Sequence, residues 1–127
     1  MTTKVTRSMT NTSSGIGYNT GDGGTVVQAT DKITAVTLNK AAGRITTHNA
    51  ALLAGGAAQF QFNNSFIEAG DLLLLTIYRA GIASSANYNV WGDVGAGAAF
   101  ITLKNVSGGS LSEAVNINFS VIKGATA

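Results

Sequence analysis

Apolar and polar residues alternate in short runs from Thr25 onward, and turn-forming residues separate the runs. Phe60 and Phe62 fall on one side of such a run, while Gln59 and Gln61 fall on the other, as side chains do along a half-buried β-strand. The spacing of the runs is close to that of a β-sandwich or barrel. Strands are therefore predicted at residues 25–30, 33–38, 43–48, 58–63, 72–80, 88–93, 98–105 and 113–123.

Segment 105–124 contains two conflicting patterns. Ser110 and Glu113 have the Ser-x-x-Glu spacing of a helix capping box. From Val115 to Val121, however, apolar residues alternate with Asn and Ser at a period of two, which belongs to a strand. Because a helix would need a different period, the segment is predicted to form a glycine-rich turn and then a final core strand.

Two other segments depart from simple alternation. Leu72 to Leu75 contains no polar residue, which predicts an inner strand covered on both faces. Residues 49–57 are rich in alanine and leucine, but Gly55 and Gly56 limit any helix, so a loop with one helical turn is predicted. The chain contains no proline, so any strand can be central, but edge strands lack proline's protection and need other cover.

Together these patterns predict an all-β fold, an antiparallel jelly-roll or Greek-key β-sandwich of about eight strands. Residues 1–24 are predicted to form a flexible, extended N-terminal arm, because they are polar and end in the glycine-rich GIGYNTGDGG. Residues 25–127 are the predicted sandwich domain.

Six apolar side chains are the candidates for binding a partner. Four are the sizeable apolar residues of the arm, which a neighbouring subunit would order. Trp91 shares a face with the polar Asn89 and Asp93, and a tryptophan on a polar face indicates an interface. A sugar platform of Tyr78, Tyr88 and Trp91 is an alternative, because aromatic rings stack on apolar sugar faces. The partner-binding candidates are Val5, Met9, Ile16, Tyr18, Tyr88 and Trp91.

The low proportion of charged residues indicates that partners contact more of the surface than these six side chains. The chain is 45% hydrophobic and only 11% charged, against about 25% charged residues in typical domains. A surface of Thr, Ser, Asn and Gly this poor in charge indicates that partners cover much of it, although a small β protein can be poor in charge without a partner. The net charge of +2 comes from scattered bases, so nucleic-acid binding is not predicted.

Targeting and membrane signals are not found in the sequence. The longest apolar run, Leu72 to Leu75, is far too short for a membrane span. The start, MTTKVTRSMTNTSSG, lacks the apolar region of a secretory signal. These features predict synthesis in the cytoplasm of the expressing cell and no membrane partner.

Candidate chemistry is sparse, because the chain has one histidine, six acidic residues and no cysteine. A Ser-His-Asp triad would have to bring His48 to Ser110 or Ser112, and no G-x-S-x-G elbow frames either serine. Glu68 and Asp71 are predicted to lie on a solvated turn, and NTGDGG lacks the spacing of a calcium loop. The chain is therefore predicted not to be an enzyme, with no catalytic, cofactor-binding or metal-binding residues.

Two long phrases resemble small virion proteins of tailed bacteriophages. They are GGTVVQATDKITAVTLNKAAGRITTHNAAL and NVSGGSLSEAVNINFSVIKG, and the resemblance extends from about Gly23 to Gly124. The middle of the chain, residues 66–94, contributes least to it. The resemblance implies a structural component of the virion, made in the host cytoplasm.

The resemblance leaves two functional hypotheses open. In the first, the chain is a capsid decoration or cement protein that binds the major capsid protein of an assembled shell as a symmetric homo-oligomer, a trimer or dimer. Its polar arm would then lie across a neighbouring subunit. In the second, the chain is a fibre or spike module whose exposed face binds a host receptor or glycan.

Overall fold

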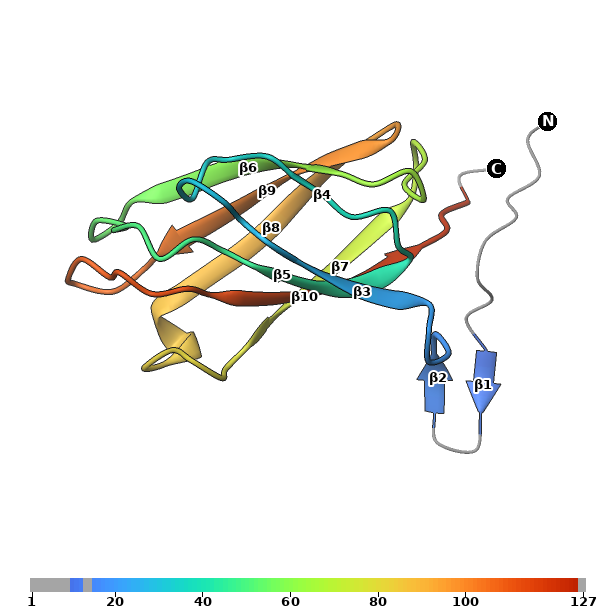
Figure 1. Cartoon of the computed structure of the whole chain (residues 1–127), viewed down its shortest axis with the longest axis horizontal. Helices are drawn as coiled ribbons and strands as arrows, with labels where there is room; N and C mark the ends of the chain where they lie inside the picture. The colour runs from blue at the N-terminus through green and yellow to red at the C-terminus, as the bar shows by residue number, and fades with distance from the viewer. Residues whose placement is uncertain (1–9, 13–14, 126–127) are drawn as a thin grey trace.

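The computed structural model describes residues 10–12 and 15–125 of the chain. These residues contain ten strands and one short 3₁₀ turn, joined by loops (Figure 1). The turn η1 (Ser85–Asn87) immediately precedes β8. The strands are β1 (Thr10–Thr12), β2 (Gly15–Gly17), β3 (Gly23–Val27), β4 (Val36–Thr37), β5 (Ala42–Thr46), β6 (Ala57–Asn63), β7 (Leu72–Tyr78), β8 (Tyr88–Gly95), β9 (Ala98–Asn105) and β10 (Asn116–Ile122).

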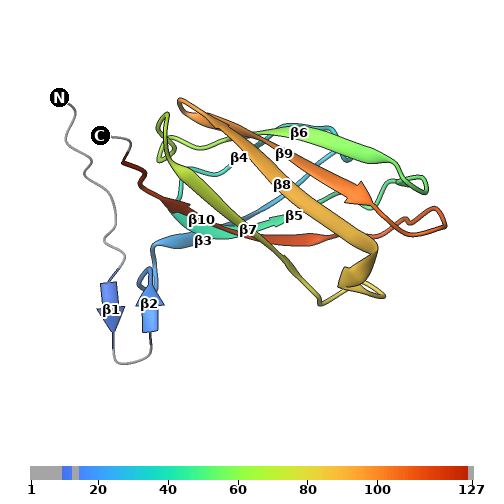
Figure 2. The same ribbon diagram turned by 180° about the vertical axis from the view of Figure 1, so that it is seen from behind.

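Strands β3 to β10 form two four-stranded sheets that face each other (Figures 1 and 2). The first sheet has the order β3-β5-β10-β7, and the second has the order β4-β6-β9-β8. Each predicted strand overlaps one of these eight, so the all-β fold is confirmed. The β1–β2 hairpin projects from the sandwich at the end where β3 begins (Figure 1).

The chain alternates between the two sheets from β3 to β6, and this path produces two parallel pairs. In the first sheet β3 runs parallel to β5, with Val26 opposite Ile45. In the second sheet β4 runs parallel to β6, with Val36 opposite Phe62. The prediction of an antiparallel sandwich is therefore wrong for these two pairs, because a chain that crosses through the other sheet returns in its original direction.

One hydrophobic core fills the space between the sheets. The apolar residues of segment 115–121 are all buried on the inward face of β10. Phe119 of the first sheet packs edge-to-face against Phe62 of the second, with ring centroids 4.8 Å apart. Along β6, buried and exposed residues alternate as the sequence predicts.

The four leucines at the start of β7 occupy a different position from the predicted one. β7 is the last strand of the first sheet, and Leu72 and Leu74 are 60% and 54% exposed. The prediction of an inner strand covered on both faces is wrong, because only Leu73 and Leu75 face the core.

Residues 49–56 form a loop without a helical turn and Ala57 begins β6, so the predicted helical turn is also wrong. Leu52 pairs with Leu111 in an isolated antiparallel bridge, with backbone bonds in both directions. Gly55 has a φ of 71°, which suits glycine and turns the chain towards β6. The long-range bridge outweighs the local helix preference of alanine and leucine.

The predicted arm contains more structure than a free segment. β3 begins at Gly23, inside the predicted arm, and β1 and β2 form a hairpin with Asn11 opposite Ile16. The hydroxyl group of Tyr18 donates a hydrogen bond to the carbonyl oxygen of Val121 on β10. Residue 18 is thus anchored to the sandwich.

Candidate interaction surface

Large apolar side chains are exposed along the side of the sandwich that carries β7 and β8. Leu72 and Leu74 lie on the outer face of the first sheet, and Trp91 and Phe100 lie on the outer face of the second. We call the first pair, together with Ile122, the leucine patch, and the second pair the aromatic patch. Exposed apolar surface of this kind marks interaction sites on soluble proteins.

The leucine patch borders a groove between β7 and β8. Ile122 of β10 pairs with Leu72, which places it next to the two exposed leucines. The groove has a volume of about 500 Å³ and is also lined by Gly92, Asp93 and Val94 of β8. It therefore connects the outer face of one sheet with the edge of the other.

The aromatic patch is bordered by polar side chains, of which Asp93, opposite Phe100 in the register, is charged. Thr102 lies between Trp91 and Gln59 in the register of the second sheet, and it is only 6% exposed despite its outward direction. The amide of Gln59 donates a hydrogen bond of 3.3 Å to the Thr102 hydroxyl group. Phe100 and Gln61 line a second groove of about 290 Å³.

The two grooves form a continuous surface around the edge of the sandwich. Asp93 and Val94 line both of them. Asp71 also lines the larger groove, but its side chain is buried and paired with Lys123. Among the described residues that line the two grooves, Asp93 is therefore the one exposed charge.

This side is open because β7 and β8 are both terminal strands of their sheets. The inward side chains of β7 are only partly buried, whereas Ile101 and Leu103 on β9 are almost fully buried. Leu73 and Leu75 approach the backbone of Gly92, where an added Cβ would come within 3.3–3.4 Å of them. Close contact at Gly92 joins the sheets, while the adjoining core side chains stay partly exposed.

The end of the sandwich next to the hairpin is held by an ion-pair network. The ammonium group of Lys123 lies 2.7 Å from Asp71 and 3.2 Å from Glu68, and it also donates to the carbonyl oxygen of Phe66. Burial acts to lower the pKa of Lys123, but hydrogen bonds to the two carboxylates and their charges raise it above its ordinary value. This network joins the end of β10 to the turn before β7.

The opposite end contains a second polar network, built around Lys32 and Glu113. Lys32 is 4% exposed and donates to the backbone carbonyl oxygens of His48 and Glu113. Burial lowers its pKa, while the charge of Glu113 acts in the opposite direction. The Glu113 carboxylate accepts a bond of 2.7 Å from the Tyr88 hydroxyl group and one of 2.8 Å from the Ala83 N–H.

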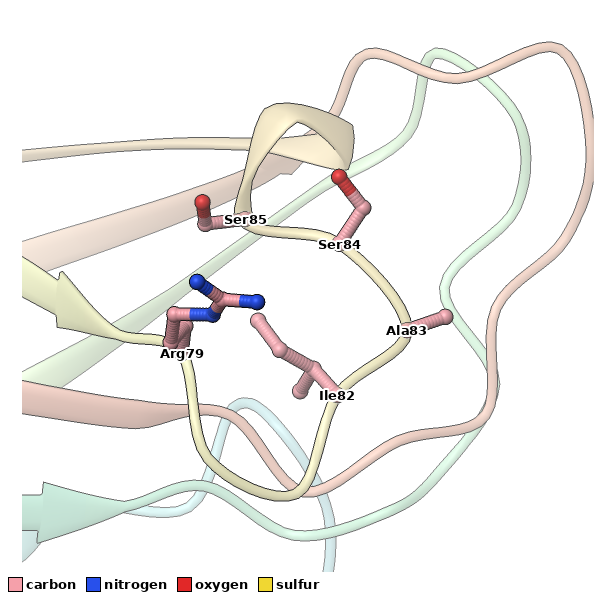
Figure 3. A pocket seen from close by; sticks show the side chains of 5 residues that line it. All are labelled: Arg79, Ile82, Ala83, Ser84 and Ser85. Atoms are coloured by element: carbon pink, nitrogen blue, oxygen red, sulfur yellow. The ribbon is translucent and has the colours of Figure 1, made fainter.

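The loop between β7 and β8 encloses a small polar hollow beside this network. Figure 3 shows the Arg79 guanidinium group and the Ile82 side chain lying in the loop, with Ser84 and Ser85 on its other arm. The hollow has a volume of about 230 Å³. It is small and polar, unlike the leucine and aromatic patches.

The structure does not bring the described partner-binding candidates together. Val5 and Met9 lie outside the described residues. Ile16 is exposed on the hairpin, and Tyr18 bonds to β10. Trp91 is exposed on the face it shares with Asn89 and Asp93, as predicted, whereas Tyr88 is buried and its hydroxyl group is bonded to Glu113.

Sequence reasoning missed the leucines and Phe100 as members of this surface. A run of four leucines is typical of a buried strand, so its sequence carries no sign of an edge position. Phe100 lies between Ala99 and Ile101, whose side chains face the core. Because neighbouring residues of a strand face opposite sides, Phe100 faces outward. The alternation in the sequence therefore could have identified Phe100 as an outward-facing residue.

His48 and the two acids considered for chemistry make structural contacts. The prediction of a solvated turn is wrong for Asp71, which is buried and paired with Lys123. The Nδ1 atom of His48 accepts a hydrogen bond of 3.0 Å from the Ala50 N–H. Within the described part of the chain, no three His, Cys, Asp or Glu side chains gather in a way that could hold a metal ion. The same residues contain no helix long and apolar enough to cross a membrane.

The fold and surface described above define an all-β protein of two mixed sheets with an apolar, charge-poor side. Comparison with protein-family models, with curated proteins and with solved structures found no match to the chain.

Proposed function

We propose that the chain is a non-enzymatic structural protein of a tailed-phage virion, a capsid decoration or cement protein that binds the assembled shell as a symmetric oligomer. The observation that carries the proposal is the charge-poor apolar surface that runs from the leucine patch to the aromatic patch. The resemblance of the two long phrases to phage virion proteins supports it. The expected jelly-roll or Greek-key connectivity stays a prediction.

The aromatic patch is the part of this surface that we assign to the major capsid protein. Trp91 and Phe100 are flat, rigid side chains on a sheet face, and such residues dominate binding energy at interfaces. Gln59 and Gln61 on the same face would supply uncharged hydrogen-bonding groups, and Asp93, opposite Phe100, would need a polar partner on the shell.

The size of the surface explains why binding would depend on many copies. Burying about 400 Å² of apolar surface contributes on the order of 10 kcal/mol. Association itself costs about 4–15 kcal/mol, so a single subunit would bind weakly. Linked subunits on a repeating shell gain from multivalency, and the projecting β1–β2 hairpin could add a contact to a neighbour.

The alternative, a fibre or spike module, has one feature in its favour. The hollow at Arg79, Ser84 and Ser85 presents a guanidinium group and hydroxyl groups, which suit an acidic or hydroxylated ligand such as a glycan. We rank it second because the hollow is small and polar, while the apolar surface is much larger.

Binding to empty capsids of the same phage tests the proposal. We expect saturable binding at a stoichiometry set by the capsid symmetry, and a higher temperature of capsid disassembly. Trp91→Ala should weaken binding at least about tenfold, equivalent to about 1.4 kcal/mol. Leu53→Ala is the control, because Leu53 is exposed in the loop before β6, outside the aromatic patch, and this variant should bind normally. Host-cell binding without capsid binding would favour the fibre module instead.

A further inference from the structure

The outer edge of β7 is an unprotected strand edge. β7 is the last strand of the first sheet, and no backbone hydrogen bond among the described residues joins its outer edge to another strand. The sequence LLLLTIY contains no proline or charged residue, the devices by which natural edge strands avoid pairing with other chains. Such an edge is a template for another strand.

Apolar side chains occupy both faces of this edge. Leu72 and Leu74 are exposed on the outer face, while Leu73, Leu75 and Ile77 on the inner face are only partly buried. A strand added here would cover apolar groups on both faces and bond to free backbone groups.

We propose that β7 pairs with β7 of a second copy of this chain, in antiparallel orientation about a twofold axis. The two four-stranded sheets would then form one continuous eight-stranded sheet. A register centred on Leu75 places Leu72 beside Tyr78 and Leu73 beside Ile77 of the partner copy. This inference goes beyond the proposed function, because it holds whether or not the chain binds a capsid.

The second copy is favoured over other occupants by charge and by symmetry. No residue of β7 is charged, and its groove carries one exposed charge, Asp93. Two cations, Arg44 over the Tyr78 ring and Arg79 after it, lie at one end of the strand. The leucine part of the edge therefore offers no charge pattern for a partner of opposite charge to recognise. The same apolar edge on a second copy would provide apolar side chains and free backbone groups that complement those of the first. A twofold contact also closes after two copies, whereas head-to-tail pairing of the same edge would continue into a filament.

The dimensions predict a dimer of modest affinity. Seven residues at about 3.4 Å each give an edge of about 24 Å, and the two sheets lie about 10 Å apart. With side chains included, this side offers on the order of 400–500 Å² per subunit, the low end for specific interfaces. Dimerisation should therefore depend on protein concentration.

Sedimentation equilibrium over a wide concentration range tests the inference. The unaltered chain should change from monomer to dimer, and Leu74→Lys should weaken the dimer at least about tenfold. Val27→Lys is the matched control, because Val27 is 69% exposed on β3, at the opposite edge of the same sheet. Circular dichroism would establish that both variants are folded.

A cysteine placed at the proposed axis provides an independent readout. The chain has no cysteine, so Leu75→Cys introduces a single thiol, and directly opposed residues of antiparallel strands are about 4.5–5.5 Å apart at Cα, within disulfide range. Mild oxidation should link Leu75→Cys subunits in pairs, and Thr25→Cys on β3 should stay unlinked. A chain that is monomeric at every concentration, or trimeric, would overturn the inference, as would equal effects of the two lysine variants or equal crosslinking of the two cysteine variants. Capsid binding is measured separately, so the β7 interface and attachment to the capsid can each fail alone.

Discussion

Glu113 illustrates how a residue acquires its role from distant neighbours. Its spacing from Ser110 matches a capping box, but the structure uses the carboxylate to hold Tyr88 and the Ala83 N–H. The Tyr88 hydroxyl group is buried beside this carboxylate, and burial and the hydrogen bond to Glu113 both raise its pKa above 10.0. This contact joins two segments that are distant in the sequence, and its contribution to stability depends on pH.

Replacing Tyr88 with phenylalanine should lower the free energy of unfolding by about 1–3 kcal/mol at neutral pH, because a hydrogen bond to a charged group is lost. As the pH rises above 10.0, the unfolded chain releases the Tyr88 proton before the folded chain does, so this group's contribution to stability falls. The Tyr88→Phe variant should thus lose less stability than the unaltered chain between neutral pH and about pH 11. Urea titrations at both pH values measure this, and parallel losses would contradict it.

Phe119 and Phe100 allow a comparison of the same side chain in two environments. Phe119 is 3% exposed and packs against Phe62, so Phe119→Ala should cost about 3–5 kcal/mol of unfolding free energy. Phe100 is 47% exposed, so Phe100→Ala should change it by no more than about 0.5 kcal/mol. Denaturant unfolding of both variants measures the difference, and similar costs would refute the assigned faces.

At the scale of elements, alternation in the sequence predicted the eight strands of the sandwich and which side of β6, β8 and β10 faces the core. A period of two arises from the pleat of each strand, so it is readable residue by residue. It does not indicate which strands are neighbours. The parallel pairs and the edge position of β7 therefore could not be predicted, because they depend on how the chain crosses between sheets.

The parallel pair of β3 and β5 depends on two opposed glycines. Gly24 lies opposite Gly43, and a methyl carbon added at Gly43 would come within 2.2 Å of the Gly24 carbonyl oxygen. Gly43→Ala should lower the free energy of unfolding by about 1–3 kcal/mol, because backbone must move. Gly108→Ala is the control, since nothing lies within 4 Å of an added Cβ there. Equal thermal stability of the two variants would show that β3 tolerates the displacement.

At the scale of the whole molecule, the candidate surface was only partly predictable from sequence. Trp91 could be recognised because it interrupts a polar face, and its exposure agrees with that interpretation. Leu72 and Leu74 could not, because their sequence is that of a buried strand. Their exposure arises from β7 standing last in its sheet, which is a property of the assembled fold.

Removal of residues 1–17 tests the predicted role of the arm. Tyr18 is retained because its hydroxyl group bonds to Val121, and we expect the sandwich to unfold within about 1 kcal/mol of the full chain. Capsid attachment should weaken, because the projecting hairpin is lost. Capsid titration with the shortened and full chains measures this. Unchanged attachment would show that the arm makes no contact with the shell.

The position of β10 has a consequence for the timing of folding. Of the strands in the first sheet, β10 is synthesised last, and it is central, between β5 and β7. The first sheet therefore cannot close until β10 has been synthesised, and the segment from β3 to β10 takes roughly 5–20 s at ordinary rates of synthesis. Until then the leucines of β7 have no partner strand at either edge. Chaperones that hold apolar segments should bind the nascent chain during this interval, and release it once β10 has inserted.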